Sequence, residues 1–589
     1  MIPINFHFRS ISLAKMEGKN VIFVDFFDTL CFRRIHSSQL YEQWAECLCQ
    51  KYPELSRRVS KTELIEARIK ASCELHKIYE EPSYRQLITK IEEFVGVYGL
   101  YEGSLFIDEA IEIGTHYPNK YIIKILSFLK RQGKKIYIIS DFYLPKSSYL
   151  KFLKHLRCEE LIDDVFVSES FNKSKYKGSL YLKVLNLLNL QVKDVVMIGD
   201  NKLADVQSAK RNMIESFWYL PLFHKLWTNY SRLRKIDYRC SSIMVQSQYL
   251  YKKTFYEEYC VALLYFCHSL YNYAWVDRVK KISFLSRGGY LLKVLFDIYQ
   301  DFIVPNEKKI ETLYCMNSRR ANEMAMKNTE QLELLKSYIE QFTYDNNSLC
   351  VVDEGWNCSS QKNLTRILNV NTIGYYIGIF NNAEIECEYK CQRRGILFHI
   401  NTLGQKSPLY DILRTNCSMY EQILTSKDGS LVRYKKDDDR QISFELMKNE
   451  KEKYLYETYI RNIQEHLILD FYGMLAWKSE KTLTKKNVAR IMLKSSFFAS
   501  RSKCHFANDL DKNRFDNFRN SLGAIENKYK DKGIKDVKIN IYELIVKPEH
   551  YVHVFCKLQR KLVHKGIIYY IYFPIAYLFY AYVRIINRF

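Results

Sequence analysis

The sequence predicts an α/β protein with two Rossmann-like domains followed by a helical C-terminal region. Short runs of β-branched, aromatic and other apolar residues lead straight into acidic residues, as at Asp25, Asp200 and Asp353, and predict buried strands. Helical periodicity separates these runs, which is typical of a parallel sheet with crossover helices. The chain has 589 residues, which is too long for one hydrophobic core. We expect α/β domains over 1–220 and 280–450, a helical connector over 221–279, and a basic helical region over 451–589.

The composition narrows the classes of partner. The chain has 89 Lys and Arg residues against 66 Asp and Glu residues, a formal net charge of +23. Such a charge favours phosphorylated substrates, nucleic acid or an anionic membrane surface, but no RNA-binding signature is present and we expect no nucleic-acid partner. The sixteen cysteines form no pair of C-x-x-C units, which argues against a zinc site. Reduced thiols and the lack of a signal-peptide pattern predict a cytoplasmic protein.

The first domain is organised around the run VIFVD, a predicted strand that ends at Asp25. Apolar residues at three- and four-residue spacing predict helices over 37–95, which we interpret as a helical cap over 35–118. A helix over 121–132 precedes a second strand, a basic segment follows at 173–178, and a further strand covers 195–199. Polar residues come directly after these later elements or lie within them: Ser140, Asp141, Lys175, Asp200 and Asp205.

This order of residues resembles the haloacid dehalogenase (HAD) superfamily. The resemblance implies that Asp25 is the nucleophile, which attacks phosphorus and forms an acyl phosphate. It implies Mg²⁺ held by Asp25, Asp200 and Asp205, because Mg²⁺ prefers carboxylate and water oxygens. Ser140 and Lys175 would then hold the phosphoryl group.

Thr29 and Asp141 are further expected substrate contacts of this site. Lys175 has a K-x-x-G spacing to Gly178, whereas Lys173 and Lys177 are interpreted as solvated.

One position departs from the pattern of HAD phosphatases. These enzymes usually carry a second Asp two residues after the nucleophile, as general acid and base, and here that position is Phe27. Asp28 follows, and it either supplies the acid or caps the next turn. The form D-x-F-D-T-L resembles a subgroup found with bacterial surface-polysaccharide enzymes. An acid–base group is worth about 10²–10⁴ in rate, so its loss would leave a slow phosphatase or a phosphate-binding site.

The middle of the chain begins with an apolar stretch over 254–275, which we interpret as a buried core helix, with a membrane span as the alternative. A strand over 282–285, a tight turn formed by Ser286, Arg287, Gly288 and Gly289, and a helix from Tyr290 follow. Such a strand–glycine–helix junction is suited to an anion, and Arg287 adds a forked donor. The alternative is an ordinary turn between a strand and a helix of an α/β domain, with no ligand.

A second motif in this domain consists of a strand over 349–352, the acidic pair Asp353 and Glu354, and a loop over 355–360. The two motifs together resemble type I phosphoribosyltransferases. The resemblance implies that Asp353 and Glu354 bind the ribose of phosphoribosyl pyrophosphate (PRPP), and that the turn at 286–289 faces the pyrophosphate. The 5-phosphate would contact Asn357, Ser359 and Ser360.

Two more strands are predicted in the second domain. One covers 313–320 and either aims Arg319 at the pyrophosphate or ends in a solvated basic turn. The other covers 374–380 as the last strand of the sheet. The family's loop has Gly and Thr where this chain has Cys358 to Gln361, so a Rossmann-like domain with acidic helix caps is the alternative.

The C-terminal region is helical in pattern and basic. Residues 567–583 carry no charge, contain Pro574 as an expected break, and follow the basic segment KLQRKLVHKG. Tyr and Phe residues beside basic residues suit a peripheral anchor on an anionic membrane at the cytoplasmic face. The alternative is a helix docked on the core.

Together the resemblances indicate an enzyme of bacterial surface-polysaccharide biosynthesis. It would transfer ribose 5-phosphate from PRPP to a lipid-linked glycan, and the HAD half would hydrolyse a phosphate. One alternative is an Mg²⁺-dependent sugar-phosphate phosphatase with a non-catalytic, substrate-binding second half. The other is a non-catalytic assembly factor.

Overall fold

The computed structural model describes residues 16, 18–226, 257–344, 348–379, 391–399, 408–437, 439, 441–477, 483–499, 501–512, 541–546, 548–565 and 567–586. The chain divides into two compact units, each described separately below. Unit 1 comprises 1–245, 302–305 and 472–479, and unit 2 comprises 246–301, 306–471 and 480–589. Most of the expected connector, 227–256, lies outside the described residues.

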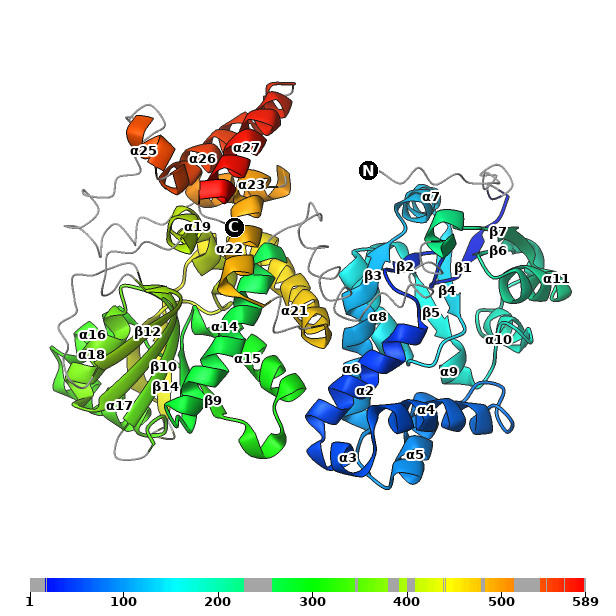
Figure 1. The fold of residues 1–589 in the computed structure, drawn as a ribbon, viewed down its shortest axis with the longest axis horizontal. Coiled ribbons are helices and arrows are strands. Elements are labelled where there is room, and N and C mark those ends of the chain that lie inside the picture. The colour runs from blue at the N-terminus through cyan, green and yellow to red at the C-terminus, as the bar shows by residue number, and fades with distance from the viewer. Residues whose placement is uncertain are drawn as a thin grey trace. The chain divides into compact units, whose positions relative to one another are not determined.

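Unit 1 contains a five-stranded parallel sheet in the order β5-β4-β1-β6-β7 (Figure 1). All four residues of β1 (Val21–Val24) are buried, as the apolar run predicted, and each such side chain contributes roughly 1.5–3 kcal/mol on burial. The other strands are β4 (Lys135–Ser140), β5 (Asp164–Val167), β6 (Val195–Gly199) and β7 (Glu215–Trp218). The chain runs outward from β1 through β4 to β5, then returns to the other side of β1 for β6 and β7. Ligands bind at the carboxyl edge where a parallel sheet reverses in this way, which here is the edge beyond β1 and β6.

The sheet is covered by α7 (Lys120–Arg131), α8 (Lys146–Leu156), α10 (Ser179–Leu187) and α11 (Ser208–Arg211). One core cluster joins Leu180, Tyr181 and Val184 of α10 to Phe23 and Met197 of the sheet. This packing places the segment before α10 at the carboxyl edge of β1.

A helical insertion separates β1 from β4. It consists of α2 (Ser38–Lys51), α3 (Pro53–Arg58), α4 (Lys61–Leu75), α5 (Tyr84–Val95) and α6 (Tyr101–Thr115). The antiparallel strands β2 (Cys31–Arg33) and β3 (His116–Pro118) pair at its two ends. Helices α4 and α5 both begin with a capping box, Ser60 with Glu63 and Ser83 with Gln86, which satisfies backbone N–H groups that have no partner within the helix.

Unit 2 contains a second parallel sheet, in the order β12-β11-β10-β8-β9. Its strands are β8 (Lys281–Leu285), β9 (Glu311–Cys315), β10 (Ser348–Trp356), β11 (Asn371–Ile379) and β12 (Cys391–His399). The spatial order is 2-1-3-4-5 in chain order, so the sheet reverses between β8 and β10. The helices within this α/β part are α15 (Gly289–Ile303), α16 (Arg319–Ala325), α17 (Thr329–Glu340) and α18 (Ser359–Leu368).

Helices make up most of the rest of unit 2, together with the small hairpin β13 (Leu431–Lys436) and β14 (Ile442–Leu446). The helices are α14 (Glu257–Val276), α19 (Pro408–Leu424), α20 (Glu450–Leu455), α21 (Arg461–Ala476), α22 (Lys485–Phe497), α23 (Arg501–Lys512), α25 (Ile541–Val546), α26 (Val552–Leu562) and α27 (Ile567–Ile586). The last part of α21, from residue 472, is assigned to unit 1. Among the described residues, no helix combines the length and apolar character needed to cross a membrane.

Four details of the second half differ from expectation. The strand expected over 313–320 ends at Cys315, and Arg319 is instead the first residue of α16, capped by Ser318. The strand expected at 374–380 is not last, because β12 pairs beyond it. Strand β10 continues through Trp356, since it pairs with β11 as far as Ile379. Pro574 lies within the continuous helix α27 and does not break it.

Candidate functional site

Three buried carboxylates meet at the carboxyl edge of the sheet of unit 1. Asp25 follows β1, Asp200 follows the neighbouring strand β6, and Asp205 lies on the helical turn after it. Strands β1 and β6 pair in parallel with Val24 opposite Ile198, so the residues after them are adjacent. One ligand atom from each carboxylate lies within 4.8 Å of the others.

Lys175 joins two of these carboxylates. Its Nζ donates to Asp25 Oδ1 at 2.5 Å and to Asp205 Oδ1 at 2.6 Å, and the residue is 2 % exposed. Asp141 accepts from the backbone N–H of Lys175 at 2.7 Å and of Tyr176 at 3.1 Å. Asp141 therefore holds the turn that carries Lys175, through both of its carboxylate oxygens.

Gly199 allows Asp205 to approach the end of β6. A Cβ at Gly199 would lie 2.3 Å from Asp205 Oδ2. Besides Lys175, the backbone N–H of Asn201 holds the Asp205 carboxylate, donating to Oδ2 at 2.9 Å.

Burial raises the affinity of Asp25 and Asp200 for protons. Burial raises the pKa of Asp25 well above its usual range, and Asp205 and Asp200 add to the effect against the opposing charge of Lys175. Burial also raises the pKa of Asp200 to about 6, although Lys225 opposes this. Burial lowers the pKa of Lys175, but Asp205 and Asp25 outweigh it and keep the amine protonated.

This group fits a divalent cation that prefers oxygen. The donors are all carboxylate oxygens, which suit Mg²⁺ and not the softer transition metals. Burial, followed by repulsion from the neighbouring carboxylates, raises the pKa values of Asp25 and Asp200, and a bound cation would favour the ionised form of both. Asp25, Asp200 and Asp205 would be the residues that hold the ion.

Ser140 ends β4 beside this group and is 1 % exposed. Its Oγ accepts a hydrogen bond from the Tyr149 hydroxyl at 2.8 Å, which leaves the proton of Ser140 to donate elsewhere. The negative charge of Asp25 contributes to the raised pKa of Tyr149, after burial, so this pair lies within the field of Asp25.

Asp200 is held by residues from two other segments. The Thr29 hydroxyl donates to Asp200 Oδ1 at 3.4 Å, and Lys225 Nζ lies 2.7 Å from Oδ2. Thr29 is fully buried and thus supports Asp200. Lys225 comes from the segment after β7 and was not expected at the site from the sequence.

Phe27 occupies the position where a general acid was expected, and an aromatic and cationic cluster encloses it. The Arg33 guanidinium lies 3.7 Å from the Phe27 ring centroid, and Phe142 packs at 4.4 Å. Arg33 is fixed by two hydrogen bonds to Glu112, of 2.7 and 2.9 Å. Phe27 is therefore a packing residue at the base of the helical insertion.

Asp28 is directed to His224, a residue that the sequence did not single out. Asp28 Oδ1 lies 3.1 Å from His224 Nε2, and His224 Nδ1 lies 3.1 Å from the Tyr117 hydroxyl. Burial raises the pKa of Asp28, but the hydrogen bond and charge of His224, with Arg33 and Lys225, bring it below its ordinary value. Asp28 also contributes to the raised pKa of Asp200, so it lies within electrostatic range of the carboxylate group.

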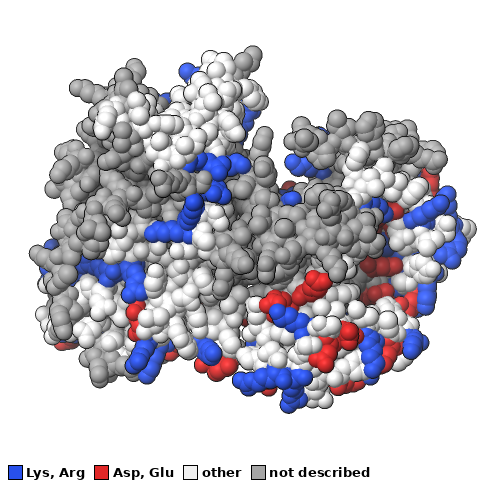
Figure 2. All heavy atoms as spheres, viewed as in Figure 1, with Lys and Arg blue, Asp and Glu red and all other residues white. Residues whose placement is uncertain are grey.

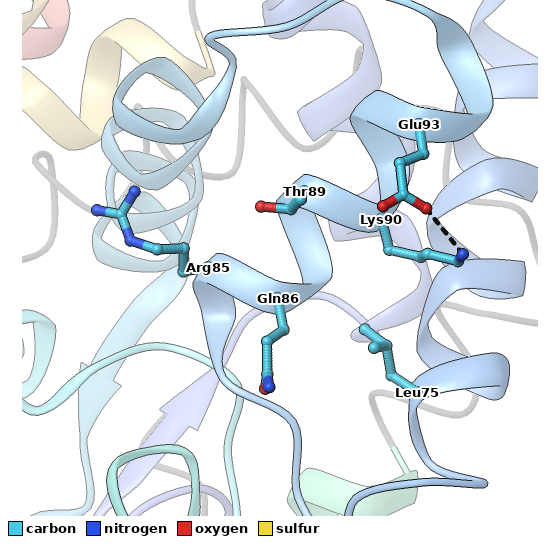
Figure 3. A pocket seen from close by; sticks show the side chains of 6 residues that line it. All are labelled: Leu75, Arg85, Gln86, Thr89, Lys90 and Glu93. Atoms are coloured by element: carbon cyan, nitrogen blue, oxygen red, sulfur yellow. Dashed lines mark hydrogen bonds and ion pairs between the residues drawn. The ribbon is translucent and has the colours of Figure 1, made fainter.

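A hollow of about 230 Å³ lies elsewhere in unit 1, on the helical insertion (Figure 3). An ion pair of 2.8 Å between Lys90 and Glu93 lies along one side. The hollow is lined by Leu75, Arg85, Gln86, Thr89, Lys90 and Glu93. None of these residues belongs to the carboxylate group. This hollow is therefore separate from the carboxylate site.

The second predicted site lies in unit 2, at the reversal point between β8 and β10. Gly288 faces Glu354 so closely that a Cβ there would lie 1.5 Å from Glu354 Oε2. Burial, then the charge of Glu354, raises the pKa of Asp353 well above its usual range, and Arg319 opposes the shift. The structure therefore brings Gly288, Asp353, Glu354 and Arg319 into one neighbourhood.

Other residues predicted for this site are placed differently. Arg287 donates to Thr425 Oγ1 at 3.2 Å and to Ser430 Oγ at 2.7 Å, and pairs with Glu452 at 3.3 Å. The Arg287 side chain is therefore bound to other residues of unit 2. Ser286 Oγ donates to the carbonyl of Asn317 at 2.8 Å.

The expected phosphate loop is also shorter than the sequence indicated. Asp353 and Glu354 lie within β10, whose pairing with β11 runs to Trp356. Only Asn357 and Cys358 separate this strand from α18, which Ser359 and Ser360 begin. The backbone N–H groups expected to face a phosphate are therefore reduced to this short turn and the first turn of α18.

Part of unit 1 matches a known family. Residues 78–219 match the family model described as haloacid dehalogenase-like hydrolase. Unit 1 contains a HAD-family hydrolase domain. Its parallel sheet, with Asp25 after the central strand, agrees with the family predicted from the sequence, and so we refer to it below as the HAD domain.

Solved structures with weak similarity include HAD proteins of several kinds. A HAD phosphatase from Thermococcus onnurineus is 21% identical, with 34% of this chain and 85% of that chain covered and a TM-score of 0.25. A HAD family enzyme from Bacteroides thetaiotaomicron, solved with magnesium and inorganic phosphate, is 12% identical, with coverages of 34% and 94% and a TM-score of 0.24. The L-2-haloacid dehalogenase from Xanthobacter autotrophicus is 14% identical, with coverages of 34% and 76% and a TM-score of 0.23. No curated protein matches the chain.

Proposed function

We propose that the HAD domain hydrolyses a phosphomonoester of a sugar, with Asp25 as the nucleophile. The observation that carries this proposal is the arrangement of Lys175 between Asp25 and Asp205, inside the carboxylate group completed by Asp200. A phosphoryl dianion needs positive charge and hydrogen-bond donors. Lys175 and Ser140 supply these from the protein.

The first step would be attack by a carboxylate oxygen of Asp25 on phosphorus. The bond from phosphorus to the sugar oxygen breaks, an acyl phosphate forms on Asp25, and the sugar oxygen takes a proton from solvent water. Lys175 neutralises charge on the phosphoryl group, and Ser140 donates its remaining proton to a phosphoryl oxygen. Mg²⁺, when bound, would supply the further positive charge that lets a carboxylate approach a dianion.

In the second step, water attacks the phosphorus and the bond to Asp25 breaks, which releases inorganic phosphate. Asp28 can accept the proton of this water, because its lowered pKa keeps it ionised at neutral pH. The same low pKa makes Asp28 a poor donor to the leaving sugar oxygen in the first step. We therefore expect slow turnover, since a general acid whose pKa lies near the operating pH contributes about 10²–10⁴ in rate.

Halide displacement is the other chemistry associated with the family's name. It is less consistent with this site, because Asp200 and Asp205 place two further carboxylates beside the nucleophile. Without a cation, these charges would repel an anionic haloacid. The carboxylate group therefore favours metal-assisted phosphoryl hydrolysis.

Release of inorganic phosphate from a panel of sugar phosphates, including ribose 5-phosphate, tests this proposal. We expect activity that requires Mg²⁺ and is lost in Asp25→Asn. Activity that Asp25→Asn retains would contradict the assignment of the nucleophile.

A second candidate function, in unit 2, is transfer of phosphoribose from PRPP to a glycan. It is favoured by the position of Gly288, Asp353 and Glu354 at the reversal point of the sheet, where α/β proteins bind their ligands. Glu354 Oε2 is buried and has no hydrogen-bond partner among the described residues, so it can accept from a sugar hydroxyl. In this proposal Arg319 faces the pyrophosphate, and Arg287 shapes the turn and does not contact the ligand.

The two activities would form one reaction sequence in bacterial surface-polysaccharide synthesis. Unit 2 would add ribose 5-phosphate to a lipid-linked glycan, and the HAD domain would remove the 5-phosphate. Calorimetry with PRPP and Mg²⁺ tests the transfer: we expect binding that Asp353→Ala abolishes and Asp25→Asn leaves intact.

Other results would favour the alternatives. Lack of PRPP binding, with phosphatase activity unaffected by Asp353→Ala, would support a plain phosphatase with a non-catalytic second unit. Normal polysaccharide production in cells that carry either Asp25→Asn or Asp353→Asn would support a non-catalytic assembly factor.

A further inference from the structure

The outward face of α27 is apolar along its whole length. One face of the helix is buried in unit 2 through Tyr569, Tyr572, Ala576, Tyr580 and Val583. The side chains on the other side are 43% to 72% exposed. They are Ile568, Tyr570, Ile571, Ile575, Tyr577, Leu578, Ile585 and Ile586. We call these exposed residues the α27 face.

Several members of the α27 face recur every three or four residues, at 568, 571, 575 and 578, and therefore form one stripe along the helix. A helix surface that faces water normally carries charged residues, yet 567–583 contains no Asp, Glu, Lys or Arg. Exposed apolar surfaces of this kind mark interaction sites.

Helix α25 extends the same surface. The Tyr582 hydroxyl donates to the carbonyl of Ile545 at 2.6 Å, which ties the two helices together. Tyr542 and Ile545 of α25 are themselves 74% and 55% exposed. The apolar surface is therefore broader than one helix.

The chain segment that forms α26 and α27 is basic, although α25 itself contains Glu543. Residues 551–589 contain six Lys and Arg residues and no Asp or Glu: Lys557, Arg560, Lys561, Lys565, Arg584 and Arg588. The Arg501 guanidinium donates to the Tyr570 hydroxyl at 3.2 Å, so a cation lies directly beside the α27 face. Burial, then the charge of Arg584, lowers the pKa of Lys494, so these two cations lie within electrostatic range of each other. Figure 2 shows a group of Lys and Arg side chains directly beneath the pale surface at the top of unit 2.

We propose that the α27 face, with α25, docks on an anionic lipid bilayer. An amphipathic helix of this kind lies in the plane of the interface, with apolar side chains among the acyl chains and cations at the phosphate level. Tyr570 and Tyr577 suit this boundary, because tyrosine has an apolar ring and a polar tip.

A second copy of the chain is a less suitable occupant. A two-fold contact pairs the same surface from both copies, so the Arg501 guanidinium beside Tyr570 would meet like charge from the second copy. A bilayer with acidic lipids offers the opposite charge. This docking goes beyond the proposed function, although it would also hold the active units close to a lipid-linked acceptor.

Flotation of the full chain with lipid vesicles tests the proposal. One set contains phosphatidylcholine alone, and the other adds phosphatidylglycerol. We expect the chain to float with the anionic vesicles only, and more weakly at about 1 M than at about 0.1 M salt, because the Debye length falls from about 10 Å to about 3 Å.

Two surface variants examine the apolar and the basic components separately. Ile575→Glu with Leu578→Glu should lower the partition coefficient at least about tenfold, since both side chains would enter the acyl region. Lys561→Glu with Lys565→Glu should weaken binding to anionic vesicles. Leu182→Glu, at a position with 53% exposure in unit 1, is the matched control and should float like the wild type.

Three results would overturn the proposal. They are equal flotation with both vesicle types, undiminished flotation of the Ile575→Glu, Leu578→Glu variant, and a dimer in velocity sedimentation that this variant dissociates. The last result would identify a second copy as the occupant. Because the substituted side chains are exposed, an unchanged melting temperature and near-ultraviolet circular dichroism would show that the variant is folded.

Discussion

Asp200→Asn is the substitution that examines the carboxylate group most quantitatively. Asp200 is buried, its pKa is about 6 against an ordinary 3.8, and the main cause is burial. The two values differ by about 2.2, and each pKa unit corresponds to about 1.36 kcal/mol, which gives about 3 kcal/mol. This is the free energy by which the ionised side chain destabilises the metal-free fold at pH above both values.

The raised pKa of Asp200 makes the metal-free HAD domain less stable as the pH rises. Because the pKa of Asp200 is raised in the folded state, the protonated side chain stabilises the fold. This stabilisation is complete below about pH 3.8 and is lost as the pH rises through about 6. The neutral amide avoids this loss. We therefore expect metal-free Asp200→Asn to be more stable than the wild type at pH 8, by up to about 3 kcal/mol, and to differ little at pH 4.

Calorimetric melting of the full chain in chelator, at pH 4 and pH 8, measures this difference in the transition of the HAD domain. Addition of Mg²⁺ at pH 8 should stabilise the wild type and leave Asp200→Asn unchanged, because the variant lacks one of the three carboxylates. Asp194→Asn, outside the carboxylate group, is the control and should behave as the wild type. Equal stability of the variant and the wild type at pH 8, together with equal Mg²⁺ response, would refute the reasoning.

Three further predictions concern the same site. Lys175→Met leaves two buried carboxylates without their cation, so denaturant unfolding should show a free energy of unfolding lower by roughly 3–5 kcal/mol. Phosphate release should fall at least about 10²-fold, and retained activity would exclude the amine from the site. Gly199→Ala places a Cβ 2.3 Å from an Asp205 oxygen, so a Mg²⁺ titration should show affinity reduced by about 10–100-fold, and unchanged affinity would mean that Asp205 is not a ligand. His224→Gln removes the charge that lowers the pKa of Asp28, so the acidic limb of the rate–pH profile should move to higher pH; an unmoved limb would show that Asp28 is not the titrating group.

The sequence predicted the carboxylate group because its signals are local. An apolar run that ends in an acidic residue indicates a strand terminus, and neighbouring parallel strands bring such termini to one edge. Asp25 and Asp200 are placed by this rule. Lys175 required the family's pattern, because a basic segment by itself indicates only a solvated turn.

Long-range contacts account for what the sequence could not predict. His224 and Lys225 reach the site from the segment after β7, and His224 lies 196 residues from its partner Asp28. In the sequence, this basic segment resembled a connector. No local pattern distinguishes a connector from a segment that folds back beside an active site.

Tertiary pairing also overrode local expectation in unit 2. Gly355 and the polar residues that follow Glu354 indicated a loop, yet β11 extends β10 to Trp356. Arg319, expected at a strand end, begins α16 because the Ser318 hydroxyl accepts from the N–H of Ala321 and caps that helix. Both differences arise from hydrogen bonds whose partners the sequence alone does not specify.

The most direct test of the central claim is chemical trapping of the nucleophile. An acyl phosphate on a carboxylate is reduced by borohydride to an alcohol, so turnover of p-nitrophenyl phosphate with Mg²⁺ followed by borohydride should convert Asp25 to homoserine. Peptide mass spectrometry should find this change at position 25 in the wild type and not in Asp25→Asn. Phosphate release without modification of Asp25, or modification at another carboxylate, would contradict the account.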